Sequence, residues 1–307
     1  MTRISVLICT YNRHALLNQA LTALLHGTAE KPTQVVVVNG GDERADQVVI
    51  DHQARCPADT TLKLVKTVNK NLAASRNIGL PHCTGDIVAM TDDDAEVFPD
   101  WVTQLKRIHA EHPEAGAIGG AVLGKDSDTR FLSRLADRVT FPSPTEAQYV
   151  RTLPGVNVSY KRSVLDIIGL QDETLFRGED VDFNWRVLKA GYKVYYHPDI
   201  KVLHHHRSSL RQFFQQHHMY GRAYYRVCRK WKEMYCVYPH QLKSVKDFLK
   251  AVNFFAAIFY EPLIYGLRMP SWKDRARAVP IMFWNGVVWR AGMVYQAYLD
   301  AVSRQQP

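Results

Sequence analysis

The first half of the chain alternates short apolar runs with helix-like stretches, and this alternation limits its fold more than any other feature. The apolar runs lie at residues 4–9, 35–38, 62–68 and 87–90, with helical patterns between them at 14–25, 43–54 and 72–80. The runs are continuously apolar, which is typical of strands covered on both faces of a parallel sheet. The sequence therefore predicts an α/β fold with a mostly parallel central sheet flanked by helices.

A polar cluster follows three of the four predicted strands. The clusters read TYNR at 10–13, NGGD at 39–42 and DDD at 92–94. Ligands of parallel sheets bind beyond the carboxyl ends of the strands. We therefore expect the three clusters to meet at one edge of the sheet.

The three adjacent aspartates, Asp92, Asp93 and Asp94, form the first candidate site. Neighbouring carboxylates repel one another, and a divalent cation such as Mg²⁺ or Mn²⁺ removes that repulsion. Mg²⁺ usually takes one or two protein carboxylates and completes its shell with water and substrate phosphates, so the cluster suits a nucleotide diphosphate. A purely structural interpretation stays open at this point, in which Asp94 caps the next turn and the other two are solvated.

The segment RGEDVDFNWR, at 177–186, is the second candidate. Glu179 and Asp180 stand where a helix is expected to begin, and carboxylates are favoured there for structural reasons alone. The aromatic residues Phe176, Phe183 and Trp185 are near them in the sequence. A partly buried carboxylate beside such side chains can have a pKa that suits a general base.

Three histidines at 204–206 end a predicted strand and form the third candidate. Side chains alternate along a strand, so His204 and His206 share one face and His205 points away. Imidazole is a common ligand of Mn²⁺ and an uncommon one of Mg²⁺. The pattern favours a metal ligand over a histidine that only fills the core.

In the middle of the chain, the regular alternation of strand-like and helix-like segments ends. Residues 124–148 resemble a mobile loop over the site. A strand at 156–160, a helix from 161 and a second helix from about 179 follow, and Gly191 is a typical left-handed cap for the second helix. Two further strands are expected at 193–196 and 200–204.

The last hundred residues differ in composition from the rest. Apolar segments lie at 251–260 and 278–289, and Pro262, Pro270 and Pro280 are expected to break this region. The uncharged runs fall short of the ~20 residues that a membrane-spanning helix needs. We expect them to lie in a membrane interface or to pack as a helical hairpin.

The net charge of +9 is concentrated in one segment. Residues 201–250 contain eleven Lys and Arg against Glu233 and Asp247, so the rest of the chain is neutral in sum. Such a segment, with Trp272, Trp284 and Trp289 in the region after it, favours contact with anionic lipid headgroups. A solvated helix face is the structural alternative, and nucleic acid, although it also attracts basic segments, is not expected as a partner.

The five cysteines contain no CxxC pair and are odd in number, which argues against a disulfide framework or a thiolate zinc site. The apolar run at 4–9 is too short for a signal-peptide core. We expect a cytoplasmic protein, peripheral at the inner face of the cytoplasmic membrane.

Five ordered segments carry a resemblance to a known family. They read VLICTYNR, NLAASRNIGL, GDIVAMTDDDAEVFPDW, PGVNVSYKRSVL and GEDVDFNWRVLKAGYKVYYHPDIKVLHH. Their order and spacing resemble family 2 glycosyltransferases of the GT-A fold. The resemblance implies that residues 1–220 form a GT-A catalytic domain, with a nucleotide-binding half at about 1–120 and an acceptor-binding half at about 121–220, and that 221–307 form a helical, basic and aromatic extension.

The same resemblance implies a function and a set of site residues. It implies inverting, metal-dependent transfer of a sugar from a nucleotide-diphosphate sugar to an acceptor hydroxyl. A glycan or lipid-linked acceptor would fit the membrane contact expected for the basic segment. Asp94 matches a metal ligand in the DxD motif, with Asp92 and Asp93 near the ribose and diphosphate. Asp180 matches the catalytic base and Glu179 its supporting neighbour. The other matches are His204 and Asp92 for the Mn²⁺ or Mg²⁺ site, with His206 as second choice, and Thr10, Tyr11, Asn12, Asn39 and Arg76 for the nucleotide sugar.

The chain departs from the family pattern at three places. Asn71 stands where the family often has Gly, which alters the loop before Arg76. Asn39 stands where the family commonly has Asp, and an amide donates as well as accepts, so the base of the donor is not fixed as uridine. The QxxRW signature of processive members is absent, which favours transfer of a single sugar. The alternatives are a nucleotidyltransferase such as a sugar-nucleotide pyrophosphorylase, and a non-catalytic basic protein that binds membrane or nucleic acid.

Overall fold

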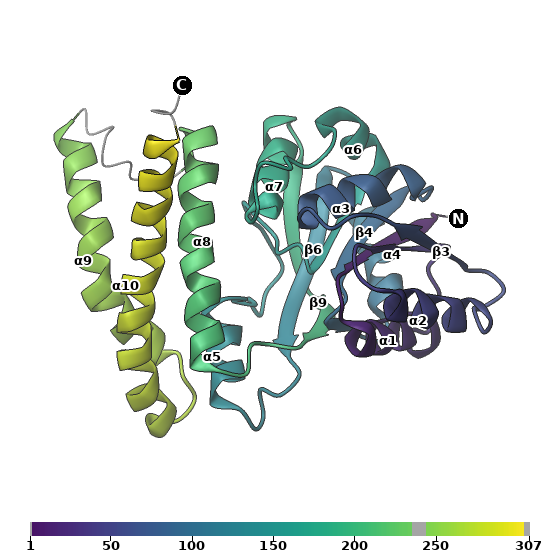
Figure 1. The fold of residues 1–307 in the computed structure, drawn as a ribbon, viewed down its shortest axis with the longest axis horizontal. Helices are drawn as coiled ribbons and strands as arrows, with labels where there is room; N and C mark the ends of the chain where they lie inside the picture. Colours follow the sequence, from purple (N-terminus) through teal and green to yellow (C-terminus); the bar gives the residue numbers. More distant parts are fainter. Residues whose placement is uncertain (1, 235–243, 304–307) are drawn as a thin grey trace. The chain divides into compact units, whose positions relative to one another are not determined.

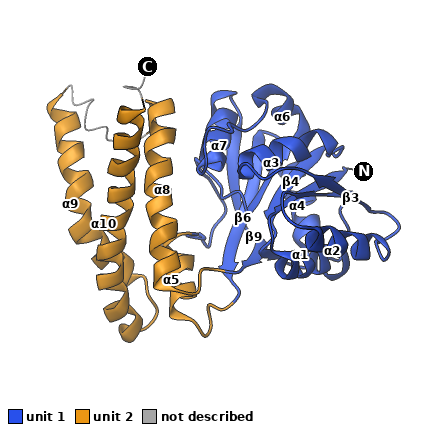
Figure 2. Cartoon of the chain, in the orientation of Figure 1, with its two compact units in different colours: residues 1–125, 141–205 blue, residues 126–140, 206–307 orange. Residues whose placement is uncertain are grey.

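The computed structural model describes residues 2–234 and 244–303 (Figure 1). The chain divides into two compact units (Figure 2). Unit 1 comprises residues 1–125 and 141–205, and unit 2 comprises residues 126–140 and 206–307. Each unit is described by itself.

Unit 1 is built on a nine-stranded mixed sheet within the described residues. Its strands are β1 (Ile4–Thr10), β2 (Gln34–Asn39), β3 (Thr61–Lys66), β4 (Ile87–Asp92), β5 (Ala95–Val97), β6 (Ala115–Gly124), β7 (Gln148–Tyr149), β8 (Asn157–Lys161) and β9 (Lys193–His204). They lie in the order β3-β2-β1-β4-β8-β6-β9-β5, and β7 pairs with β9.

The parallel half of the sheet has the predicted design. β1, β2, β3 and β4 are parallel neighbours, and their register pairs Thr10 with Asn39 and Cys9 with Asp92. The three polar clusters therefore follow the same edge of the sheet, as expected from the strand ends. β8 lies antiparallel between β4 and β6, and β9 runs parallel to β6, so the sheet is mixed.

Helices cover both faces of the sheet in unit 1. They are α1 (His14–Thr22), the π-helical turn η1 (Ala23–Gly27), α2 (Glu43–Gln53), α3 (Leu72–Gly79), the 3₁₀ turn η2 (Leu80–His82), α4 (Trp101–Glu111), α6 (Arg162–Ile168) and α7 (Glu179–Lys189). Ile4, Val6 and Ile8 of β1 join the apolar cluster that contains Trp101 of α4, whereas Leu7 joins the cluster that contains Phe183 of α7. Because both faces are buried, the strands read as continuous apolar runs.

The end of α7 and the strand after it fit the predictions unequally. Gly191 has a φ of +88°, the left-handed conformation expected after this helix. The two strands predicted at 193–196 and 200–204 are a single strand, β9. Its register against β6 shifts between Gly120 and Ala121, so an irregularity in pairing, rather than a strand end, separates the two apolar runs.

Unit 2 is helical: α5 (Phe131–Val139), α8 (Leu210–Lys230), α9 (Val245–Leu267) and α10 (Trp272–Val302). The division differs from the predicted one at residues 220 and 221, because α8 runs unbroken through both positions. It packs closely on α10: a Cβ at Gly221 would lie 1.8 Å from the Trp289 carbonyl oxygen, and one at Gly292 would lie 2.1 Å from the His218 carbonyl oxygen. Residues 126–140 join the same unit.

Two local predictions in unit 2 are wrong. Residues 124–148 contain helix α5, whose Leu135 is buried against Phe213 of α8, so an apolar face orders part of a segment that reads as a loop. Pro262 and Pro280 lie inside α9 and α10 and do not end them, whereas Pro270 stands between the two helices. Tertiary packing outweighs the cost of the backbone hydrogen bond that each proline removes.

Candidate functional site

The aspartates that end β4 and the histidine that ends β9 meet through the short strand β5. β5 pairs antiparallel with β9, with Ala95 opposite His204. The His205 amide donates to the Asp94 carbonyl oxygen at 2.9 Å. This pairing brings His204 Nε2 to 3.3 Å from Asp94 Oδ1, although the two residues are far apart in the sequence.

Asp92, Asp94 and His204 form a group that suits a divalent cation. One carboxylate or imidazole ligand atom of each lies within 4.8 Å of the others. Two carboxylates and one imidazole are a donor set suited to Mn²⁺, with positions left for water or phosphate oxygens. The residues present therefore fit the predicted metal.

The other two histidines point elsewhere. His205 Nε2 lies 3.3 Å from Glu96 Oε1, which agrees with the expected alternation along the strand. His206 belongs to unit 2, where its Nε2 lies 2.8 Å from Asp137 Oδ1. His206, the second choice for the metal, is not a member of the Asp92–Asp94–His204 group.

Arg13 is a site residue that the sequence analysis missed. Its Nη1 lies 3.0 Å from Asp93 Oδ1 and 2.5 Å from Asp94 Oδ2. Thr10 donates its hydroxyl to Asp93 Oδ2 at 2.7 Å. In this structure, Arg13 and Thr10 therefore offset part of the repulsion within the acidic cluster. Arg13 is the last residue of the motif TYNR, and its place in that motif was the signal that could have identified it.

The environment of the aspartates changes their proton affinity. Burial raises the pKa of Asp93 to about 7, against the opposing charge of Arg13, and the charge of Asp94 adds to the rise. Burial also raises the pKa of Asp92, although the charge of Arg76 acts in the opposite direction. Both shifts reflect the cost of holding negative charge in a buried cluster, which a bound cation lowers.

Arg76 connects the two acidic motifs. Its Nη2 lies 3.2 Å from Asp92 Oδ1, and its Nη1 lies 3.2 Å from Glu179 Oε1. Nη2 also donates to the Gly155 carbonyl oxygen at 3.2 Å. The side chain is only 3% exposed. These contacts support a role in positioning the two carboxylates, and the predicted contact of Arg76 with the nucleotide sugar stays a prediction.

Asp180 is held by backbone amides at the start of α7. Its Oδ2 accepts from the Gly155 amide at 3.1 Å and its Oδ1 from the Val181 amide at 2.8 Å. Gly155 fits only as glycine, because a Cβ there would lie 2.7 Å from the Arg76 guanidinium. The carboxylate is half-buried and fixed in orientation, as a general base requires.

Glu179 differs from its neighbour in environment. Its side chain is 9% exposed and pairs with Arg76. Burial raises the pKa of Glu179 to about 7, the charge of Asp180 adds to the rise, and Arg76 opposes it. The two adjacent carboxylates therefore have separate structural roles, with Glu179 tied to Arg76 and Asp180 tied to the backbone.

The loops after β1 and β2 contain the remaining predicted contacts. Tyr11 is 52% exposed. Asn12 has a φ of +56°, and its Oδ1 accepts from the Asp42 amide at 2.9 Å. Asn39 donates to Asp46 Oδ1 at 2.8 Å and accepts from the Gly41 amide at 2.8 Å. The Asn39 amide thus organises its own loop, and its predicted contact with the base stays a prediction.

Comparison with known proteins identifies the family. The model of "Glycosyl transferase family 2" matches residues 5–168, more than half of the chain, and that of "Glycosyl transferase family group 2" matches residues 87–294. The chain belongs to glycosyl transferase family 2. The first match contains the acidic cluster at the end of β4, and the second also contains α7 and His204.

Curated relatives of this family 2 chain include two with named activities. The glucosyl-dolichyl phosphate glucuronosyltransferase of Haloferax volcanii is 30% identical over 193 residues, which are 58% of this chain and 58% of that protein. The pre-mycofactocin glycosyltransferase of Mycobacterium tuberculosis is 28% identical over 190 residues, which are 57% of this chain and 40% of that protein. The similarity thus spans only part of each relative.

Solved structures confirm the GT-A fold. The mannosyltransferase PcManGT from Pyrobaculum calidifontis, solved with GDP-Man and Mn²⁺, has a TM-score of 0.64 at 19% identity over 97% of this chain and 86% of that one. S. aureus TarS 1-349 has a TM-score of 0.53 at 15% identity over 97% of this chain and 92% of that one. At these identities the likeness concerns the fold alone.

Proposed function

We propose that this family 2 chain transfers a single sugar from a nucleotide-diphosphate sugar to an acceptor hydroxyl, with inversion at the anomeric carbon. The observation that carries the proposal is the grouping of Asp92, Asp94 and His204 at the carboxyl edge of the sheet. Arg76 links this group to the motif that contains Asp180, because it contacts both Asp92 and Glu179. One buried side chain thus contacts a candidate metal ligand and the neighbour of the candidate base.

Asp94, Asp92 and His204 would hold Mn²⁺ or Mg²⁺. When bound, the cation supplies a positive charge that stabilises the leaving diphosphate. The mannosyltransferase of similar fold was solved with Mn²⁺ and a nucleotide sugar, which supports this assignment. Arg13, which contacts both Asp93 and Asp94, lies where a guanidinium can also reach a phosphate.

Asp180 acts as the general base in this proposal. It accepts the proton of the acceptor hydroxyl, whose oxygen attacks the anomeric carbon from the face opposite the nucleotide. The amides of Gly155 and Val181 hold the carboxylate in place during this step. A single displacement inverts the configuration. Glu179 and Arg76 position the residues around Asp180 and do not exchange protons with the substrate.

The acceptor class follows from a relative and from helix α9. The archaeal relative is named for a dolichyl phosphate sugar. Six side chains of α9 form an outward apolar face and are between 40% and 70% exposed: Phe248, Val252, Phe255, Phe259, Leu263 and Leu267. An exposed apolar surface of this size is typical of a contact with protein or membrane. We propose a lipid-linked acceptor and peripheral contact with the cytoplasmic face of a membrane.

The length of α9 differs from the sequence-based expectation. The uncharged run at 251–260 is short, but the helix extends to 23 residues, with a mean hydropathy of 1.2 in its most apolar window. Among the described residues, α9 is the one helix that is long and apolar enough to cross a membrane. Of the three tryptophans expected at an interface, Trp272 and Trp284 are exposed, whereas Trp289 packs against Tyr224.

The test combines donor binding with turnover. The purified full chain is screened against nucleotide sugars by thermal shift, with Mn²⁺ or with EDTA, and the stabilising donor is then used in a transfer assay with a short-chain lipid-phosphate sugar. Asp180→Asn keeps the shape of the side chain and removes its basicity. We expect the same thermal shift as in the wild type and a loss of turnover of roughly 10³-fold.

A matched control uses a carboxylate outside the site. Asp166 is exposed on α6, so Asp166→Asn is expected to leave donor binding and turnover unchanged. If no nucleotide sugar stabilises the wild type in the presence of Mn²⁺, or if Asp180→Asn turns over at the wild-type rate, the proposed function is wrong.

A further inference from the structure

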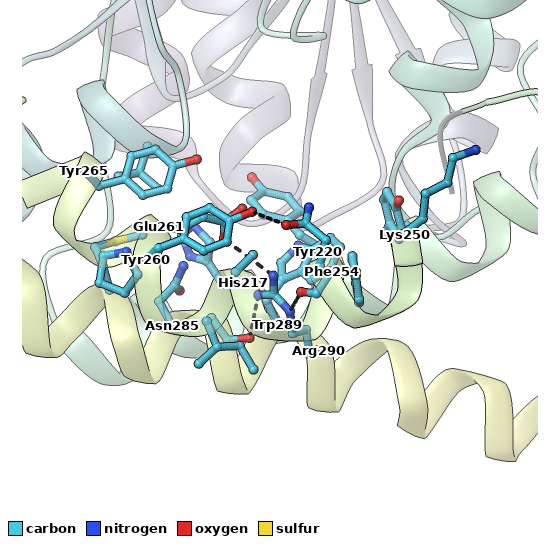
Figure 3. A pocket seen from close by; sticks show the side chains of 18 of the residues that line it. His217, Tyr220, Lys250, Phe254, Tyr260, Glu261, Tyr265, Asn285, Trp289 and Arg290 are labelled. Carbon is cyan, nitrogen blue, oxygen red and sulfur yellow. Dashed lines mark hydrogen bonds and ion pairs between the residues drawn. The ribbon is translucent and has the colours of Figure 1, made fainter. Parts of the chain in front are cut away.

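Unit 2 contains a cavity of about 730 Å³ lined by α8, α9 and α10 and by the end of α5 (Figure 3). This volume lies in the range of roughly 300–1,000 Å³ that holds small-molecule ligands. The residues of α9 that line it recur every three or four positions from Lys246 to Tyr265. At a rise of about 1.5 Å per residue, the lined face is roughly 28 Å long, so the cavity is elongated.

The two faces of α9 differ in polarity. Its outward face is apolar, as described above, whereas the face toward the cavity is mixed, with Lys250, Asn253 and Glu261 among apolar side chains. A helix of a water-soluble unit normally turns its polar face to solvent. The exposed apolar face favours an apolar environment outside the helix, and the polar residues of the cavity face can contact a ligand.

The cavity wall includes a buried acceptor that lacks a donor from the described protein. Asn285 is 5% exposed, lines the cavity, and its Oδ1 has no hydrogen-bond partner among the described residues. Leaving such an atom unsatisfied costs about 1–3 kcal/mol. A ligand with a hydroxyl donor would satisfy this oxygen.

Positive charge and aromatic rings complete the wall. Lys246, Lys250 and Arg290 line the cavity against one acid, Glu261, so the lining favours an anion. The Arg290 guanidinium lies 4.7 Å from the centre of the Phe254 ring and 3.5 Å from Glu261 Oε2. Figure 3 shows Lys250 and Tyr265 toward opposite ends, with Asn285 and Arg290 between them.

Exposed apolar residues of α9 belong to the cavity lining. Leu249 and Tyr260 both line it, and they are 60% and 40% exposed. These residues can contact an apolar chain that is joined to a headgroup inside the cavity.

We propose that the cavity of unit 2 binds the phosphosugar headgroup of a lipid-linked saccharide. A sugar hydroxyl donates to Asn285 Oδ1, the phosphate lies toward Lys250 and Arg290, and the chain follows the apolar face of α9. This inference rests on the proposed function, since it names the acceptor class, but binding itself requires neither the metal nor the donor.

The test measures binding without turnover. The full chain is titrated by calorimetry, in EDTA and without donor, with a short-chain isoprenyl phosphoglucose. Two comparison ligands are titrated in the same way: the same glucosyl phosphate without a chain, and octyl glucoside, which has no phosphate. We expect the chain-bearing phosphoglucose to bind at least tenfold more tightly than either. Equal binding of the glucosyl phosphate would indicate that the ligand is a soluble sugar phosphate. Equal binding of octyl glucoside would show that the phosphate does not contribute to binding. Either result overturns the proposal.

Variants of the cavity wall make the test specific. Asn285→Leu is expected to weaken binding about tenfold without lowering the unfolding temperature, because its buried oxygen has no protein partner to lose. Val294→Leu, on an exposed position of α10 outside the cavity, is the matched control and should bind like the wild type. Unchanged affinity in Asn285→Leu would overturn the proposal.

A second variant covers the case in which Asn285→Leu does not fold. A Cβ at Gly286 would meet its nearest neighbour, Arg290 Nη1, at 3.4 Å, so Gly286→Ala adds a methyl group on the cavity side in ordinary van der Waals contact. We expect it to weaken binding by at least tenfold, and wild-type affinity would contradict the proposal. Asp180→Asn should bind normally. Binding without any transfer would end the proposed function alone, and transfer without binding would end this inference alone.

Discussion

The two units place their charged and apolar groups in opposite ways. In unit 1, Asp92, Asp93 and Asp94 lie at the edge of a buried sheet, contacted by Arg13, Arg76 and His204. In unit 2, α9 turns its apolar face outward and polar groups toward a cavity. The first arrangement uses burial to concentrate charge where a reaction needs it. The second arrangement exposes apolar side chains to water, which is unfavourable unless an apolar surface lies against α9.

The largest expected effect concerns the acidic end of unit 1. Asp94→Asn keeps the shape of the side chain but removes a charge from the metal group, so we expect turnover to fall by roughly 10³-fold. The increase in unfolding temperature that the donor causes in the presence of Mn²⁺ should disappear as well. Asp100→Asn, an exposed position just after β5, is the control and should leave both measurements unchanged. Retained turnover in Asp94→Asn would contradict the role of the cluster.

A second change tests whether the buried charges of unit 1 depend on one another. Arg76→Met leaves Asp92 and Glu179 without their shared partner, and we expect the free energy of unfolding to fall by about 3 kcal/mol in urea titrations. Arg44→Met, at an exposed pair with Asp42, should change it by less than about 0.5 kcal/mol. Similar small effects for both variants would show that Arg76 does not hold the site together.

The pH dependence of stability tests the same network more finely. Because the folded-state pKa of Glu179 is raised from 4.5 to about 7, the folded protein retains that proton where the unfolded chain releases it. The free energy of unfolding, measured in EDTA, should therefore decrease as the pH rises from about 4.5 to about 7, by about 3 kcal/mol from this group.

Glu179→Gln removes one of the titrating groups and should reduce the slope in that window, while the raised pKa of Asp93 keeps part of it. Glu146→Gln, at an exposed position, should keep the wild-type slope. A wild-type slope in Glu179→Gln would assign the whole effect to other groups of the cluster.

The smallest expected effect concerns the apolar face of α9. Phe259→Ser combined with Leu263→Ser removes two exposed apolar side chains, and we expect binding to vesicles that contain phosphatidylglycerol to weaken about tenfold. The free energy of unfolding should stay within about 0.5 kcal/mol of the wild type, because neither side chain is buried. Ile167→Ser, 60% exposed in unit 1, is the control and should not change vesicle binding. If the double variant binds vesicles like the wild type, the apolar face of α9 does not contact the membrane, and the proposed difference between the two units is wrong.

Local patterns predicted the parallel half of the fold well. The runs that became β1, β2 and β4 are apolar because both faces of the sheet are covered, and the polar clusters mark where those strands end. The insertion of β8 between β4 and β6 could not be predicted in this way. Strand order depends on contacts between distant segments, which a period of two or 3.6 residues does not encode.

The site was predictable in its residue types and less so in its contacts. The carboxylates of 92–94 stand out in the sequence because adjacent charges are costly. The contacts of Arg13 with Asp93 and of Arg76 with Glu179 join residues separated by 80 and 103 positions. Gly155 was missed as a site residue because its role depends on the guanidinium that packs against it. The length of α9 was underestimated because Lys246, Asp247 and Lys250 interrupt its apolar pattern near the start.

The central claim is that a cation binds to Asp92, Asp94 and His204, and electron paramagnetic resonance of Mn²⁺ bound to the full chain tests it most directly. The account predicts one bound Mn²⁺ whose spectrum shows coupling to an imidazole nitrogen, and this coupling should vanish in His204→Gln and persist in His206→Gln. A spectrum without nitrogen coupling in the wild type, or coupling that survives in His204→Gln, would contradict it.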